Sequence, residues 1–379
     1  AVLCNQKALD IAGINKNTKI SGGIINIKDG KPTGILIDNA TGPVEKIIPE
    51  LTEDVASRYL KQAEDDCFSL GLTGVVDCGV KSGRIKVLES LYNSGKLTIG
   101  NSILLSQDKE TLDEYAHLGF VKNGQFQING IKMYADGALG SRGACLLEQY
   151  SDEKDHYGLM LSKTEEFRAI SELAKAYQLQ LCTHAIGDSA NRAILRLYSE
   201  FLPKTNDFRW RIEHAQVIDY QDYVWFSEYN IVPSVQPTHA ISDMPWAGNR
   251  LGEKRLPTAY AYKKLLEQNG WLPLGTDFPV EGLNPLATFY TAVARKDFSG
   301  FPENGFMIEN ALTRQEALLG MTIWAAKSVF WEKEKGSIEI GKAADLVILD
   351  RDIMNCDEKD IMNSKVLYTI VKGKTVYKK

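Results

Sequence analysis

Strand-like apolar segments alternate with helix-like segments along most of this chain, at roughly 30 residues per unit, which is the length of a βαβ unit. Strands and helices that alternate in this way predict a parallel sheet. Seven such strands favour a (β/α) barrel over an open sheet. No GxGxxG sequence occupies the first strand–helix turn, so a dinucleotide-binding fold is not indicated. The predicted strands span residues 71–80, 97–105, 128–137, 179–188, 209–217, 231–240 and 270–280.

Both ends of the chain depart from this alternation. Apolar and polar residues alternate on either side of Asp29-Gly30, which is a strong signal for a β-hairpin at residues 22–37. Strict alternation near the C-terminus is typical of antiparallel strands in a separate small sheet. We therefore expect a barrel domain over residues 1–333, with a hairpin insertion near 20–40, and a small β domain over 334–379.

Charge, hydropathy and cysteine usage exclude several classes of protein. A net charge of -5 and the lack of a basic patch with interleaved aromatic residues argue against a nucleic-acid binder. No apolar run approaches the roughly 18 to 20 residues that a membrane span needs, and the first residues do not resemble a signal peptide. The six cysteines show no CxxC spacing. We expect a reduced, cytoplasmic chain rather than a disulfide scaffold.

Four residues at the ends of predicted strands carry the chemistry. Lys132 lies inside an apolar strand, where a lysine is costly unless it is paired or changes its charge state. Later strands end on His184, His214 and Asp277. Because catalytic residues of (β/α) barrels lie at the carboxyl ends of the strands, we expect these four side chains to converge on one site.

Taken singly, each of these residues has an ordinary explanation. A strand-end histidine is more often a hydrogen-bonded core residue than a ligand, and Asp277 alone could cap a helix. As a set they favour a metal site, because imidazole and carboxylate together suit Zn, Fe or Mn. Of the other histidines, His117 and His156 are expected on the surface. His239 lies at the end of the predicted strand at 231–240, where it could either contact substrate or only shape the long loop that follows.

Five motifs, in this order, resemble the amidohydrolase superfamily, and most closely its branch of N-substituted formamide deformylase-like enzymes. The motifs are GIKMYADGALGSRGA, THAIGDSANRAI, RIEHAQ, GTDFPV and GSIEIGKAADLVILD. The resemblance implies a distorted TIM barrel, a small β-sandwich and one or two divalent metal ions. It also implies that Lys132 can be carboxylated to bridge two metals, that His184 and His214 are ligands, and that Asp277 is both a ligand and the general base.

The sequence departs from this family in one respect. No His-x-His pair, which the family carries on its first barrel strand, occurs here, and the upstream half of the β-sandwich is not recognisable. We therefore expect a fragment whose barrel lacks its first strand, with residues 334–379 as the C-terminal half of the sandwich. For this chain alone we expect at most one well-occupied metal ion, preferentially zinc, held by Lys132, His184 and His214. Carboxylation of Lys132 is left open.

The expected reaction is hydrolysis of a non-peptide, amide-type C–N bond in a small molecule by metal-activated water, with Asp277 moving the proton. Two alternatives stay open: a catalytically inactive scaffold, and a hydrolase of another bond such as a lactone or phosphoester. A homo-oligomer is compatible with the sequence. Arg142 either clamps a substrate carboxylate or forms a structural ion pair. The residues expected to contact substrate are Arg142, His239, Asp243, Trp246 and Arg250.

Overall fold

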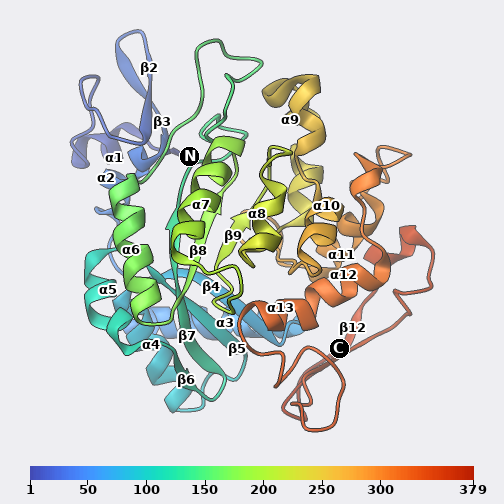
Figure 1. Ribbon diagram of the computed structural model, residues 1–379. Coiled ribbons are helices and arrows are strands. Elements are labelled where there is room, and N and C mark those ends of the chain that lie inside the picture. Colours follow the sequence, from blue (N-terminus) through green and yellow to red (C-terminus); the bar gives the residue numbers. More distant parts are fainter.

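A curled parallel sheet lies at the centre of the protein, and helices pack around its outer face (Figure 1). The structure is a computed structural model that describes residues 1–379. The parallel strands follow the spatial order β10-β9-β8-β7-β5-β4, and the short strand β6 pairs antiparallel with β7. The bounds are β4 (Gly74–Val80), β5 (Gly100–Ser106), β6 (Val121–Asn123), β7 (Phe126–Tyr134), β8 (Gln180–Ala185), β9 (Arg211–His214) and β10 (Val232–Ser234).

The sheet does not close into a complete barrel. β4 pairs with β5 on one side and has no hydrogen-bonded neighbour on the other. At the opposite edge, the predicted strand at 270–280 is wrong over most of its length, because only a single parallel bridge joins Leu274 to Val235. Pro273 and Pro279 lie within this segment and lack the N–H groups that a strand ladder needs. The prediction of a TIM-type sheet with a gap in it is confirmed. That the chain is a fragment stays a prediction.

The helices on the outer face alternate with the parallel strands, as the sequence predicts. Their apolar faces and the sheet enclose one large hydrophobic cluster that includes Ile103, Ile131, Leu181 and Ile212. No helix combines the length and the hydropathy that crossing a membrane would require. The bounds are α3 (Glu53–Ser69), α4 (Ser82–Asn93), α5 (Lys109–Tyr115), α6 (Thr164–Ala176), α7 (Asp188–Phe201), α8 (Tyr223–Glu228), α10 (Tyr262–Asn269), α11 (Pro285–Ala294), α12 (Arg314–Met321) and α13 (Ile323–Ser328).

One predicted strand is partly replaced by a helix. The segment 231–240 is extended only as far as Ser234, and α9 (Pro237–Arg255) begins at Pro237. Proline is favoured in the first turn of a helix, where its missing N–H has no partner to lose. The prediction of a long loop after this strand is therefore wrong. Its candidate substrate contacts lie on a helix instead.

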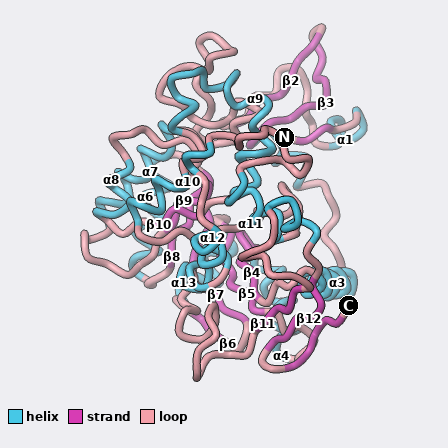
Figure 2. Tube along the Cα trace, turned by 90° about the vertical axis from the view of Figure 1, so that its right-hand side faces the viewer, coloured by secondary structure: helices cyan, strands magenta, loops and turns pink.

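Two small antiparallel sheets flank the central sheet, as the sequence predicts. β1 (Val2–Leu3), β2 (Gly23–Lys28) and β3 (Lys31–Asp38) form the first, beside α1 (Gln6–Ile11) and α2 (Gly42–Glu45). β11 (Leu346–Leu349), β12 (Val366–Val371) and β13 (Lys374–Lys378) form the second, close to α3 (Figure 2). The Thr369 hydroxyl of β12 donates a 2.6 Å hydrogen bond to the Phe68 carbonyl of α3. The domain division at residues 333 and 334 stays a proposal.

Trp210, directly before β9, supports the strand that carries His214. Its side chain is fully buried, with its ring centroid 4.9 Å from that of Tyr198, and its indole N–H donates to the Leu179 carbonyl. Trp210→Ala is expected to lower the free energy of unfolding by about 3–5 kcal/mol, because it leaves a large cavity. Denaturant titration measures this, with Trp225→Ala at a half-buried position as the milder control. A loss under about 1 kcal/mol, typical of a surface substitution, would contradict this packing role.

Candidate metal centre

The side chains predicted to bind metal all lie at the carboxyl end of the parallel sheet. Lys132 lies near the end of β7, His184 near the end of β8, and His214 is the last residue of β9. These three strands are direct neighbours in the sheet. Asp277 follows the bridge residue Leu274 at the far edge. The curl of the sheet therefore brings residues from several separate units towards one place.

Three of the side chains converge closely. His214, His239 and Asp277 each offer a ligand atom, and these atoms lie within 4.8 Å of one another. His239 Nε2 lies 3.4 Å from Asp277 Oδ2. The rings of His184 and His214 have centroids 4.5 Å apart. The structure thus adds His239 to the set, because α9 starts immediately after β10 and places its first turn at the end of the sheet.

A buried ring nitrogen on each histidine lacks a partner. His184 Nε2, His214 Nδ1 and His239 Nε2 are all buried and form no hydrogen bond. Each buried polar atom without a partner costs about 1–3 kcal/mol. The His214 and His239 rings converge with the Asp277 carboxylate, and His184 packs against His214. Imidazole and carboxylate together are the donor set that zinc and similar divalent ions prefer. The residues present therefore fit a metal ion.

The charge states also suit a metal ion. Burial, together with the charge of Lys132, lowers the pKa of His184 to about 3. Burial lowers the pKa of His214 well below its usual value, with additional repulsion from His184 and His239. Both imidazoles are therefore neutral at pH 7, which is the form that binds metal. Burial raises the pKa of Asp277, but the neighbouring His239, His214 and Lys132 outweigh this and leave the pKa below its usual value.

The backbone is strained at two of these positions. His214 has φ 76° and Asp277 has φ 58°, which is the left-handed region that non-glycine residues rarely occupy. Such conformations cost about 1–3 kcal/mol each and concentrate at functional sites. In this protein they turn both side chains out of the strand direction at the point where the ligands meet.

Lys132 keeps the unusual environment that the sequence predicts. Its side chain is 5% exposed and forms no salt bridge with a carboxylate. Its Nζ lies 4.4 Å from the centroid of the Tyr134 ring and 3.5 Å from the Met133 carbonyl oxygen. A buried ammonium with so few partners is poorly compensated.

Asp136, which the sequence analysis did not select, supports His184. Its carboxylate is buried and accepts hydrogen bonds from the backbone N–H groups of Cys145, Ile186 and Gly187. Its Oδ1 lies 3.5 Å from His184 Nε2. Burial raises the pKa of Asp136 to about 7, against the lowering effect of these hydrogen bonds. Asp136 ties the loop after β7 to the loop after β8 and so fixes the position of His184.

Replacing Asp136 with Asn is expected to weaken metal binding by roughly 10–100-fold, the usual effect of losing a group that orients a ligand. The variant keeps the size of the side chain but loses the carboxylate that holds both loops. Competition with a coloured chelator measures the affinity. Asp219→Asn, on the surface, is the matched control. Equal affinities of Asp136→Asn and the unaltered protein would exclude this role.

A cavity of about 1560 Å³ opens from the metal centre. His239, Asp243 and Trp246 line it, as predicted for substrate contacts. Asp243 Oδ2 accepts hydrogen bonds from the Tyr260 hydroxyl (2.8 Å) and the Gln216 amide (3.2 Å). Burial raises the pKa of Asp243 to about 6.

The two arginines predicted to contact substrate lie outside this cavity. Arg142 pairs with Asp152 through its Nε at 3.0 Å, and Arg250 pairs with the same carboxylate. Arg250 also donates to the Gly140 carbonyl. For Arg142 this geometry matches the structural ion pair that the sequence left as the alternative. A substrate contact by either arginine stays a prediction that the geometry does not support.

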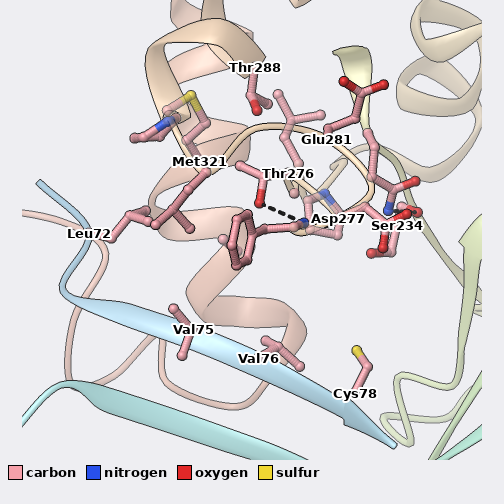
Figure 3. A pocket seen from close by; sticks show the side chains of 18 of the residues that line it. Leu72, Val75, Val76, Cys78, Ser234, Thr276, Asp277, Glu281, Thr288 and Met321 are labelled. Atoms are coloured by element: carbon pink, nitrogen blue, oxygen red, sulfur yellow. Dashed lines mark hydrogen bonds between the residues drawn. The ribbon is translucent and has the colours of Figure 1, made fainter. Parts of the chain in front are cut away.

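One wall of the cavity is the open edge of the sheet (Figure 3). Val75, Val76 and Cys78 of β4 lie on one side, and Thr276 and Met321 lie opposite. The cavity therefore joins a polar end at the ligands to an apolar end along β4.

Comparison with known proteins decides the family. The sequence model of the family described as "Amidohydrolase family" matches residues 1–377 of this chain. The chain belongs to the amidohydrolase family. This confirms the resemblance that the five sequence motifs carry.

Other amidohydrolases and related proteins match over nearly the whole chain. The Protein LONG AFTER FAR-RED 3 of Arabidopsis thaliana is 32% identical over 392 residues, which are 99% of this chain and 67% of that protein. The N-substituted formamide deformylase of Arthrobacter pascens is 26% identical over 399 residues, with 100% and 72% covered. The crystal structure of an uncharacterized metal-dependent hydrolase from Pyrococcus horikoshii OT3 has a TM-score of 0.79 and 28% identity, with 94% and 70% covered. These matches support a hydrolase that uses a divalent metal.

Proposed function

We propose that this amidohydrolase cleaves an amide-type C–N bond, other than a peptide bond, in a small molecule. The observation that carries the proposal is the set of unpartnered ring nitrogens of His184, His214 and His239 beside Asp277. The relative named N-substituted formamide deformylase supports the bond type, because deformylation of such a formamide breaks a C–N bond. A cytoplasmic location belongs to the same proposal and agrees with six free cysteines.

In this proposal His184, His214, His239 and Asp277 would hold the metal, with zinc preferred for its affinity for imidazole. A bound divalent ion supplies a water of lowered pKa and a polarised carbonyl. Asp277 is ionised and accepts the proton of the attacking water, then returns it to the departing nitrogen. Asp136 holds the loop that follows His184 through its hydrogen bonds to the Ile186 and Gly187 backbone.

Lys132 is proposed to act as a carbamate in the complete site. Carboxylation replaces a poorly compensated buried cation with an anion that can join the ligands. For this chain alone, at most one well-occupied ion remains the prediction. Two fully occupied ions would contradict it.

A substrate panel tests the proposed bond type. Metal-loaded protein is offered an N-substituted formamide, a small lactone and a phosphate monoester, and turnover is followed before and after removal of the metal by a chelator. The proposal expects hydrolysis of the formamide that stops on chelation and returns when zinc is added. Turnover of only the lactone or the phosphoester would overturn the bond type. Protein that neither binds metal nor turns over any substrate would favour a scaffold.

A further inference from the structure

Asp38 places a carboxylate from the N-terminal sheet against the glycine-rich loop that lines the proposed active-site cavity. It is the last residue of β3 and adopts φ 51°, in the left-handed region. Its carboxylate lies against the backbone of the glycine-rich loop after β7. A Cβ built on Gly137 or on Gly143 would lie 2.3 Å from Asp38 Oδ2, so only glycine leaves room there. In Figure 1 the hairpin and α9 lie at the same end of the molecule, on either side of this loop.

Nothing in the protein compensates this carboxylate. Asp38 Oδ2 is buried and accepts no hydrogen bond, and no lysine or arginine side chain forms a salt bridge with Asp38. Burial accordingly raises the pKa of Asp38. A strained backbone and a buried acceptor without a partner both cost free energy. A carboxylate that only fastened the hairpin to the barrel would have a donor on the barrel, and Asp38 has none.

The side chain lies in the cavity of the proposed active site. Asp38, His184, His239 and Asp277 line the same cavity. Gly137, which the carboxylate contacts, directly follows Asp136, whose Oδ1 lies 3.5 Å from His184 Nε2. The loop that Asp38 contacts therefore also carries Asp136, which lies next to the ligand His184.

Two further carboxylates line the same cavity. Asp243 and Glu281 line it together with Asp38. Asp243 has donors of its own in Tyr260 and Gln216. Of the three, the carboxylate of Asp38 is the one with no hydrogen-bond donor from the protein, so it is free for a donor on the ligand.

We propose that Asp38 is a specificity residue that binds a protonated amino group of the substrate. The inference rests on the proposed function and names its substrate class: small amides that carry an ammonium group near the scissile bond. A charge-assisted hydrogen bond between an ammonium and a carboxylate is among the stronger polar contacts. The ammonium would bind the carboxylate through Oδ1, because Oδ2 is buried against the loop and Oδ1 is not.

Two isosteric probes test this. N-(2-aminoethyl)formamide carries the ammonium, and N-propylformamide has a methyl group in its place. Unaltered protein is expected to prefer the charged probe. Asp38→Asn is expected to lose roughly 10–100-fold in kcat/KM on the charged probe, mainly through KM, since a hydrogen bond to a charged group contributes that much. On the neutral probe it should change less than about threefold. Asparagine tolerates a left-handed backbone, so the turn is kept.

Asp29→Asn is the matched control, because Asp29 also has a positive φ, lies on the same hairpin and is exposed. It should leave both probes unaffected. Thermal melting and metal content should be the same in all three proteins. Equal loss on both probes, or a fall in melting temperature with unchanged probe preference, would overturn the role of Asp38.

A binding measurement separates this inference from the proposed function. Calorimetric titration of both probes into metal-loaded protein reports selectivity even where neither probe turns over. If unaltered protein binds the charged probe selectively and Asp38→Asn loses that selectivity, the inference is supported, even when the proposed amide hydrolysis is not observed. Equal binding of both probes to unaltered protein would overturn the inference although amide hydrolysis holds.

Discussion

Asp277→Asn is expected to lower kcat for amide hydrolysis by roughly 10²–10⁴-fold, the usual contribution of a positioned general base. Asparagine keeps the shape of the side chain and one oxygen that can face the metal, but it cannot take up a proton. The attacking water then loses its proton acceptor, and the leaving nitrogen loses its donor. Steady-state kinetics on the formamide substrate measure the effect.

The control for this substitution is Glu281→Gln. Glu281 lies in the same cavity and accepts a hydrogen bond from Ser242, but it is not among the converging ligand atoms. It should retain kcat within a few-fold. Because Asp277 is also a proposed ligand, the kcat of Asp277→Asn is measured at saturating zinc. If Asp277→Asn retained full turnover, Asp277 would not be the base. If it lost all metal, its role would be that of a ligand only.

His214→Ala is expected to weaken metal binding by at least roughly 100-fold and to abolish turnover. Loss of a direct ligand should exceed the 10–100-fold effect of losing a group that only orients one. His214 lies between the other two histidines, with ring centroids 4.5 Å from His184 and 5.5 Å from His239. Metal analysis after dialysis against a weak chelator measures the loss.

His117→Ala is the matched control, since His117 is exposed, lies between α5 and β6, and does not line the cavity. It should keep the metal content and activity of unaltered protein. Full metal occupancy in His214→Ala would contradict the site. A variant that lost metal together with its fold would be recognised by circular dichroism, and His214→Gln would then replace it.

The sequence predicts the parts of this protein that follow from local patterns. Alternating apolar segments give the positions of β4, β5, β7, β8 and β9, and the barrel rule then places Lys132, His184 and His214 at one end. Each of these steps uses residues close together in the chain. The prediction works because parallel strands leave little choice about which end carries their final residues.

Other features depend on contacts that local patterns do not contain. Pro237 starts a helix inside a segment whose residues favour a strand, and this moves His239 into the ligand cluster. The carboxylate of Asp136 takes its donors from two later loops. Asp38 meets the loop after β7 from a different sheet, so its role depends on packing between distant segments. Only the folded structure brings these groups together.

The most direct test of the metal centre is a crystal structure of the protein grown with zinc, with anomalous diffraction data collected at the zinc edge. We predict one strong zinc peak among the side chains of His184, His214, His239 and Asp277. The peak should lie at about 2.0–2.2 Å, the usual zinc–ligand distance, from the ring nitrogens that now lack a partner (His184 Nε2, His214 Nδ1 and His239 Nε2) or from the Asp277 carboxylate. A strong zinc peak elsewhere in the protein, with these nitrogens bound only to water or protein groups, would contradict it.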